Sequence, residues 1–259
     1  DPRYSRYRFN WLIHPKNTQE EYDNYSKTLP PDIFDSCYAA VFSSSSGRYI
    51  TKEMFEDALE DYKLILPEKA TVYFGLDIAG EDTKSRNTDS TALVGYINIR
   101  TEEGRYKSKM VYFKVFPPRT KRTTIYDEIT SLFKNTNFGC LAYDKMGSGD
   151  TVRNMLTDPV GKYKIPAYLV IPLTYSLENK TAVYRNLHEM YSLRKIKHPD
   201  IPILRNETET LDFEKCEGST NLKVHAYRDS LHDDTVDANA NAVWAATRAA
   251  TTRASIQII

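Results

Sequence analysis

The sequence predicts an α/β protein in which helices cover both faces of a mixed β-sheet, preceded by a short helical and loop lead-in. Three observations predict this class. From Thr71 onward, short apolar runs typical of buried strands recur along the chain. The first three runs are joined by short links and the later ones alternate with helical patterns, which is the order of a mixed sheet. Hydrophobic residues make up 41% of the 259 residues, enough to bury a core.

The first part of the chain, residues 1–66, is expected to be a lead-in of loops and short helices. Thr18 and Glu21 have the spacing of a capping box that opens a helix. Thr51 precedes a second predicted helix. The apolar face of that helix comprises Phe55, Ala58, Leu59 and Tyr62. The pattern changes at Pro67, so residues 67–259 are predicted to form a separate domain.

Five strands are predicted in this second part from apolar runs rich in β-branched and aromatic residues. They cover residues 72–76, 91–99, 109–116, 140–143 and 167–171, and Leu222–Ala226 is a further candidate. Glu103 and Gly104 are expected to form the hairpin turn between the second and third strands.

Four helices are predicted among these strands from apolar residues spaced three and four apart. They start near Thr123, cover 151–156, centre on 183–191 and run from about Asp234 to Ala250. The glycine-bearing segment 146–150 is predicted to be the turn before the second of them. Three strands followed by alternating helices and strands match the order of the ribonuclease H-like (RNase H-like) fold.

Aspartates at the ends of predicted elements are the candidates for chemistry. Asp77 ends the first strand, Asp144 ends the fourth, and Asp233 and Asp234 precede the last helix. Strands one and four would be parallel neighbours, so a helix packed across the sheet could bring all these carboxylates together. Such a group is costly unless a cation neutralises it, and hard oxygen ligands suit Mg²⁺ or Mn²⁺. Two such ions about 3.5–4 Å apart can hydrolyse a phosphodiester in line, leaving a 3′-hydroxyl.

Each of these residues also has an interpretation without chemistry. A strand-end aspartate is commonly a turn residue, and Asp233 or Asp234 is a favoured helix N-cap. Three further residues are open in the same way. Asp237 shares a helix face with Asp233 or is a solvated acid, and His232 assists proton transfer or is a polar neighbour. Asp89 is an accessory ligand near Asp77 or has no role.

The acidic motifs resemble those of a known family. The sequence LDIA at 76–79, followed by TDSTAL at 88–93, resembles the opening of the nuclease domain of phage large terminase subunits. The segment 143–149 is similar to that family's second acidic position with its glycine-containing turn. The sequence HDD at 232–234, entering an alanine-rich helix, resembles a further motif of the family.

The lead-in resembles the segment that joins a terminase ATPase to its nuclease. This resemblance rests on residues 17–22, 29–34 and 38–42. No G-x-x-x-x-G-K-[ST] phosphate-binding motif is present, so no ATPase is expected within the chain itself. Because the chain begins with Asp1 rather than methionine, we expect a fragment of a longer protein.

The resemblance implies a divalent-metal-dependent endonuclease that cuts concatemeric viral double-stranded DNA during genome packaging. It implies Asp77, Asp144 and one or both of Asp233 and Asp234 as metal ligands, with Asp77, Asp144 and Asp234 catalytic and two Mg²⁺ or Mn²⁺ ions bound. The implied partners are an N-terminal ATPase domain in the full-length protein, a portal and a small terminase subunit. The implied location is the host cell cytoplasm rather than the mature virion.

Candidates for DNA contact are basic residues near the acids. They are Lys145, Arg153, Arg119 and Arg122. Such clusters are also typical of solvated faces. Nothing in the sequence indicates base-specific contacts, so little sequence specificity is expected.

Bulk properties limit these hypotheses only in part. Lysine plus arginine equals aspartate plus glutamate, 35 against 35, so net charge neither proposes nor excludes nucleic acid. The cysteines Cys37, Cys140 and Cys216 show no CxxC spacing, which indicates neither structural zinc nor a disulfide framework. No apolar run approaches the roughly 20 residues that span a bilayer, and we expect no membrane association.

The alternatives to a terminase nuclease are a junction resolvase, an RNA–DNA hybrid nuclease, or a non-catalytic scaffold of the packaging motor.

Overall fold

The computed structural model describes residues 9–28, 34, 37–40, 48–79, 90–101, 106–145, 151–215, 221–226 and 232–256. The chain divides into two compact units, Asp1–Gly47 and Arg48–Ile259. This division falls before the boundary predicted at residue 66. Residues 48–66 join the second unit because Phe55 and Ala58 are buried in its core.

The first unit contains the helical turn η1 (Trp11–Ile13) and the helix α1 (Gln19–Thr28). The capping box predicted for α1 is confirmed. Thr18 N lies 3.1 Å from Glu21 Oε2, and Glu21 N lies 3.2 Å from Thr18 Oγ1. Aromatic rings hold the described part of this unit together, with Tyr25 and Tyr38 at a centroid distance of 4.7 Å.

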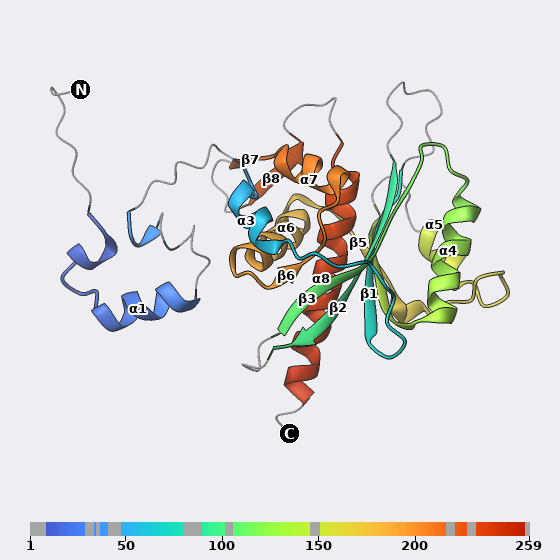
Figure 1. Ribbon diagram of the computed structural model, residues 1–259, viewed down its shortest axis with the longest axis horizontal. Coiled ribbons are helices and arrows are strands. Elements are labelled where there is room, and N and C mark those ends of the chain that lie inside the picture. Colours follow the sequence, from blue (N-terminus) through green and yellow to red (C-terminus); the bar gives the residue numbers. More distant parts are fainter. Residues whose placement is uncertain are drawn as a thin grey trace. The chain divides into compact units, whose positions relative to one another are not determined.

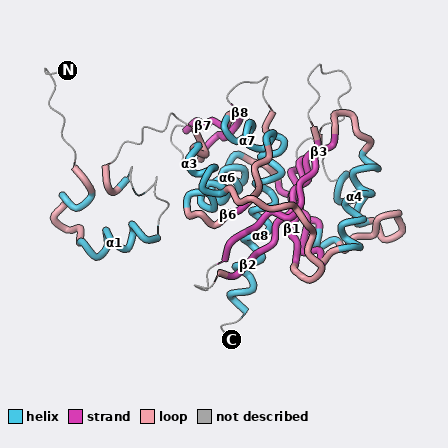
Figure 2. The backbone as a smooth tube through the Cα atoms, in the orientation of Figure 1, coloured by secondary structure: helices cyan, strands magenta, loops and turns pink. Residues whose placement is uncertain are grey.

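The second unit is built on a six-stranded mixed sheet (Figures 1 and 2). Its strands are β1 (Thr71–Asp77), β2 (Thr91–Arg100), β3 (Tyr106–Phe116), β4 (Asn137–Asp144), β5 (Val170–Leu173) and β6 (Ile196–Lys197). Their spatial order is β5-β4-β1-β2-β3-β6. The first three strands form an antiparallel meander and β4 pairs in parallel with β1, as the sequence predicted. β5 pairs in parallel with β4.

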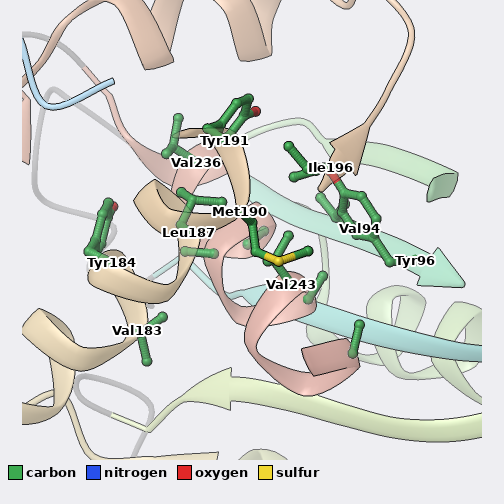
Figure 3. Packing of buried hydrophobic residues seen from close by; sticks show 14 of the residues in the cluster. Val94, Tyr96, Val183, Tyr184, Leu187, Met190, Tyr191, Ile196, Val236 and Val243 are labelled. Carbon is green, nitrogen blue, oxygen red and sulfur yellow. The ribbon is translucent and has the colours of Figure 1, made fainter. Parts of the chain in front are cut away.

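Helices cover both faces of this sheet, which confirms the predicted class (Figure 1). The helices are α3 (Lys52–Ala58), α4 (Arg122–Asn135), α5 (Thr151–Thr157), α6 (Leu177–Ser192), α7 (Pro202–Glu209) and α8 (Asp234–Ile256). Two buried clusters define the layers. One packs α4 and α5 against Phe74 and Leu141, and the other packs α3, α6 and α8 against Tyr73 and Ala142. Figure 3 shows part of the second cluster, around Leu187, Met190 and Val243.

Some predicted elements differ from those observed. The fifth strand was predicted over 167–171, but a 3-10 turn η2 (Ala167–Leu169) follows Pro166 and the strand runs over Val170–Leu173. The helix after Thr51 ends at Ala58, so Leu59 and Tyr62 are not part of it. The predicted turns at 103–104 and 146–150 contain residues outside the described part of the chain.

Three short elements were not predicted: α7, β6 and the strand β7 (Leu211–Lys215). β7 pairs with β8 (Leu222–Ala226) in a separate two-stranded sheet. The candidate strand at Leu222–Ala226 is therefore confirmed, but it lies outside the main sheet. None of the helices among the described residues is long and apolar enough to cross a membrane.

Candidate active site

Asp77 and Asp144 end neighbouring parallel strands at the same edge of the sheet. In the pairing of β1 with β4, Leu76 lies opposite Tyr143. Asp77 and Asp144 are the next residues along each strand. Neighbouring strands lie about 4.8 Å apart, so the two aspartates are adjacent.

Both aspartates also lie on the face of the sheet that α8 covers. Successive side chains along a strand point to opposite faces. In β1, Tyr73 packs with residues of α8 and Gly75 lies against the α8 backbone, so Asp77 is on the same side. In β4, Ala142 belongs to the same cluster, and Asp144 follows two residues later.

The close contact of α8 with β1 depends on Gly75. A Cβ atom at this position would lie 2.1 Å from Ala242 N and 2.2 Å from Ala238 O, both in the backbone of α8. Only a glycine allows the helix to lie so near the strand. This contact brings the first turn of α8, with Asp234 and Asp237, to the edge where β1 ends at Asp77.

Asp234 links α8 to the beginning of β2. Its side chain is buried, and Oδ2 accepts a hydrogen bond from Ser90 N at 2.7 Å. His232 Nδ1 lies 4.0 Å from the same oxygen. Asp233 precedes the helix, and its carbonyl oxygen accepts from Asp237 N at 2.8 Å. The Asp234 side chain therefore connects α8 to another part of the chain, which is more than the capping of its own helix.

The carboxylates are close enough to act on one another electrostatically. Burial raises the pKa of Asp77 well above its ordinary value, and the negative charges of Asp237, Asp234 and Asp233 raise that pKa further. Lys180 acts in the opposite direction. The structure therefore brings together the acids predicted from three separate elements. Asp89 lies outside the described residues.

Asp237 is held by α6 through both of its carboxylate oxygens. Tyr184 Oη donates to Oδ1 at 2.6 Å, and Lys180 Nζ lies 3.3 Å from Oδ2. Burial lowers the pKa of Lys180, but the negative charges of Asp237, Asp233 and Asp77 outweigh that effect and raise it. These contacts favour an anchoring role for Asp237 over the role of a solvated surface acid.

A second polar contact fixes α8 one turn further along. Asn241 Nδ2 donates to Leu76 O at 3.1 Å, and its Oδ1 accepts from Tyr175 Oη at 2.6 Å. Burial and the negative charges of Asp237, Asp77 and Asp144 raise the pKa of Tyr175 well above its ordinary value. The Tyr175 hydroxyl is therefore within electrostatic range of both strand-end aspartates.

By chemistry and charge, the donor set fits a hard divalent cation. Carboxylate oxygens are the ligands that Mg²⁺ and Mn²⁺ prefer, and a cation would relieve the repulsion on Asp77. Within the described residues, no three His, Cys, Asp or Glu side chains already form a complete metal-binding group.

Three of the four basic candidates follow strands that end at this edge of the sheet. Phe116 ends β3 opposite Thr91, one residue before the partner of Asp77, and the segment with Arg119 and Arg122 follows. Arg119 is exposed and has a positive φ of 66°. Lys145 directly follows Asp144. Arg153 lies on α5 and is half-buried.

Several residues of this site were not identified from the sequence. They are Lys180, Tyr184, Tyr175 and Asn241. Their partners lie far away along the chain, so no local spacing marks them. The sequence signal that could have indicated Asn241 was the presence of asparagines in an alanine-rich helix. Asn239 and Asn241 are both fully buried in the structure.

Solved structures similar to this chain include large terminases of bacteriophages and a large terminase nuclease. The large terminase nuclease from thermophilic phage G20c has a TM-score of 0.54 at 14% identity, covering 76% of this chain and 97% of its own. It was also solved with bound magnesium. A large terminase from another thermophilic bacteriophage has a TM-score of 0.60 at 12% identity over 91% of this chain. The HK97 bacteriophage large terminase has a TM-score of 0.56 at 12% identity over 88% of this chain.

These similarities show the fold. The chain has the α/β architecture of large terminase nuclease domains, and the predicted RNase H-like fold is confirmed. It spans 54% of the second thermophilic phage's large terminase and 50% of the HK97 large terminase, about half the length of each. No protein-family model and no curated protein matches the sequence.

Proposed function

We propose that the chain is the nuclease part of a viral large terminase subunit, a divalent-metal-dependent endonuclease that cuts double-stranded DNA. The observation that carries the proposal is the position of Asp77 and Asp144. They end adjacent parallel strands on the face covered by α8, whose acidic first turn lies at the same edge. The magnesium bound to the G20c nuclease, which has this fold, supports a divalent ion.

The proposed ligands are Asp77, Asp144 and Asp234, with Asp233 as a further one. Two Mg²⁺ or Mn²⁺ ions bound there would supply an activated water and stabilise the leaving oxygen of the phosphodiester. The residues of the chain hold the ligands in place: Asn241 fixes α8 against β1, and Tyr184 and Lys180 hold the acidic turn against α6. His232 is at the correct end of α8 to accept or donate a proton.

DNA is proposed to lie across the edge of the sheet where these acids gather. Arg119, Arg122, Lys145 and Arg153 are the proposed phosphate contacts. Backbone contacts of this kind carry no base information, so cleavage should show little sequence specificity. Removing one phosphate contact should lower the slope of log affinity against log salt by about 0.9. Binding of metal-free protein to duplex DNA, with and without Arg119→Ala, measures this, and an unchanged slope would remove Arg119 from the interface.

The wider setting follows from the same proposal. The large terminase of the second thermophilic phage, of which this chain spans about half, was solved in complex with ATP-gamma-S. We infer an ATPase domain upstream in the full-length protein, with a portal and a small terminase subunit as partners. The place of action would be the host cell cytoplasm, on concatemeric viral DNA.

Cleavage of supercoiled plasmid tests the function. With Mg²⁺ or Mn²⁺ the wild type should convert the plasmid to nicked and linear forms, whereas Asp77→Ala, Asp144→Ala and Asp234→Ala should each lose at least about 100-fold of the rate. Asp127→Ala is the control, because Asp127 lies on α4 and pairs with Lys162 outside the site. Circular dichroism checks that each variant is folded.

The substrate distinguishes this nuclease from others of the same fold. Plain duplex should be cut at least as well as a four-way junction or an RNA–DNA hybrid. A strong preference for either of the latter would replace the terminase assignment with a resolvase or a hybrid nuclease. Wild-type activity that survives all three aspartate substitutions would refute the proposed site.

A further inference from the structure

Glu207 lies on α7 but contacts the acidic turn of α8. Its Oε2 accepts a hydrogen bond from Thr235 N at 2.8 Å and another from the Thr235 hydroxyl. The residue is 9% exposed. Thr235 directly follows Asp234, so Glu207 is hydrogen-bonded to the backbone of the turn that carries the carboxylates.

The physical reason for this contact lies in the helix terminus. The first N–H groups of a helix have no partner within the helix, and a carboxylate there also interacts favourably with the helix dipole. The side chain of Asp234 hydrogen-bonds to Ser90 instead. Glu207 supplies a cap from another element and leaves Asp234 turned toward β2.

The position of Glu207 is itself fixed from outside the site. Arg205, two residues earlier on α7, pairs with Glu56 on α3 and with Asp200, and its guanidinium lies 4.9 Å from the centre of the Phe55 ring. Leu204, on the same helix, is fully buried. α7 is thus a fixed support against which the first turn of α8 rests.

We propose that Glu207 is a positioning residue of the acidic centre: its carboxylate holds the first turn of α8 in the orientation that presents Asp233 and Asp234 to Asp77 and Asp144. This inference rests on the proposed nuclease function for the identity of the ligands. Glu207 acts through the backbone of α8. Outer partners that orient metal ligands typically change metal affinity by about 10–100-fold when removed.

The test compares Glu207→Ala with Leu204→Ala, a cavity variant on the same helix that leaves the cap in place. Mn²⁺ binding without DNA is measured by calorimetry, well below the unfolding temperature of both. We expect Glu207→Ala to weaken Mn²⁺ binding by about 10-fold or more and Leu204→Ala to leave it unchanged. Glu207→Gln, whose amide oxygen still accepts hydrogen bonds, should bind Mn²⁺ more tightly than Glu207→Ala.

Hydrogen–deuterium exchange of residues 233–238 provides a readout without metal. The amides of this turn should exchange faster in Glu207→Ala than in wild type or Leu204→Ala. Wild-type Mn²⁺ affinity in Glu207→Ala, or an equal loss in Leu204→Ala, overturns the inference. If the wild type binds no Mn²⁺, the proposed function fails, and the exchange comparison alone decides whether Glu207 holds the turn.

Discussion

His198 shows at the scale of one residue how packing sets a protonation state. Its ring is fully buried against the rings of Phe55 and Tyr191, with Nδ1 3.0 Å from Pro199 O and Nε2 3.0 Å from Tyr191 Oη. The carbonyl can only accept, so Nδ1 donates to it and Nε2 accepts from the tyrosine hydroxyl in the neutral ring. Burial lowers the pKa of His198 from 6.5 to about 4, against the opposing effects of the Pro199 carbonyl and Asp200.

This shift makes the stability depend on pH. The unfolded chain takes up a proton at His198 below pH 6.5, whereas the folded protein does so only near pH 4, so stability is lost as pH falls through this window. The full effect is about 3 kcal/mol. In His198→Gln the amide oxygen can still accept from Tyr191 but does not titrate. Urea unfolding at a series of pH values should therefore show a flatter pH dependence in this variant, and equal slopes would contradict the pKa shift.

How far single residues could be predicted depends on where their partners lie. Asp77, Asp144 and Asp234 could be selected because each marks the end or beginning of an element. Glu207 could not, because its partner Thr235 is 28 residues away and neither residue belongs to a local motif. The same holds for Lys180, which is 57 residues from Asp237.

At the scale of elements, the site depends on the packing of α8 on β1. This helix could be predicted from its alanine-rich sequence and from the aspartates at its beginning, and the structure confirms it as Asp234–Ile256. Its Ala238, Ala242 and Ala245 are buried, and their small side chains allow the helix to approach the sheet closely. The two-stranded sheet of β7 and β8 could not be predicted in the same way. β7 has only two apolar residues, Leu211 and Phe213, in its five positions, and so short an alternation does not mark a strand.

Gly75→Ala tests the packing of α8 on β1. The new methyl group would overlap the backbone of α8 at Ala238 and Ala242, which cannot move aside as a side chain could. We expect a loss of at least about 3 kcal/mol, the upper end of the cost of overpacking. Gly95→Ala is the matched control on β2, because its nearest contacts, at 2.8 to 3.0 Å, are side-chain atoms of Phe74 and Tyr112. Urea unfolding measures the stability of both variants. Equal losses of stability would show that overlap with the backbone of α8 costs no more than overlap with side chains.

At the scale of the whole molecule, the boundary between the two units follows from burial rather than from sequence pattern. The change at Pro67 is real, since the strands of the main sheet begin after it. A pattern of short helices and loops does not, however, reveal which core it packs against. Tyr49, Ile50 and Phe55 are buried with α6 and α7, contacts that no local spacing encodes.

Two truncations separate the alternative boundaries. Residues 48–259 comprise the whole second unit and should unfold cooperatively with the stability of its core intact. Residues 67–259 lack α3 and the hydrogen bonds that residues 48–66 make to the sheet edge, because His198 N donates to Ala58 O and Tyr62 Oη donates to Met110 O.

The fragment 67–259 should be much less stable than the fragment 48–259. Burying a side chain such as Ile50 or Phe55 contributes about 1.5–3 kcal/mol, so deleting both removes roughly 3–6 kcal/mol from a total stability of about 5–15 kcal/mol. Urea unfolding followed by circular dichroism should give a clear transition for 48–259 and a strongly destabilised or insoluble 67–259. Equal stability of the two fragments would mean that the segment 48–66 only lies on the surface of the core, and the boundary at residue 66 would then describe the folding unit better. A cooperative 48–259 beside a failed 67–259 would instead make α3 and its neighbours part of the support that fixes α7, and with it the acidic turn of α8.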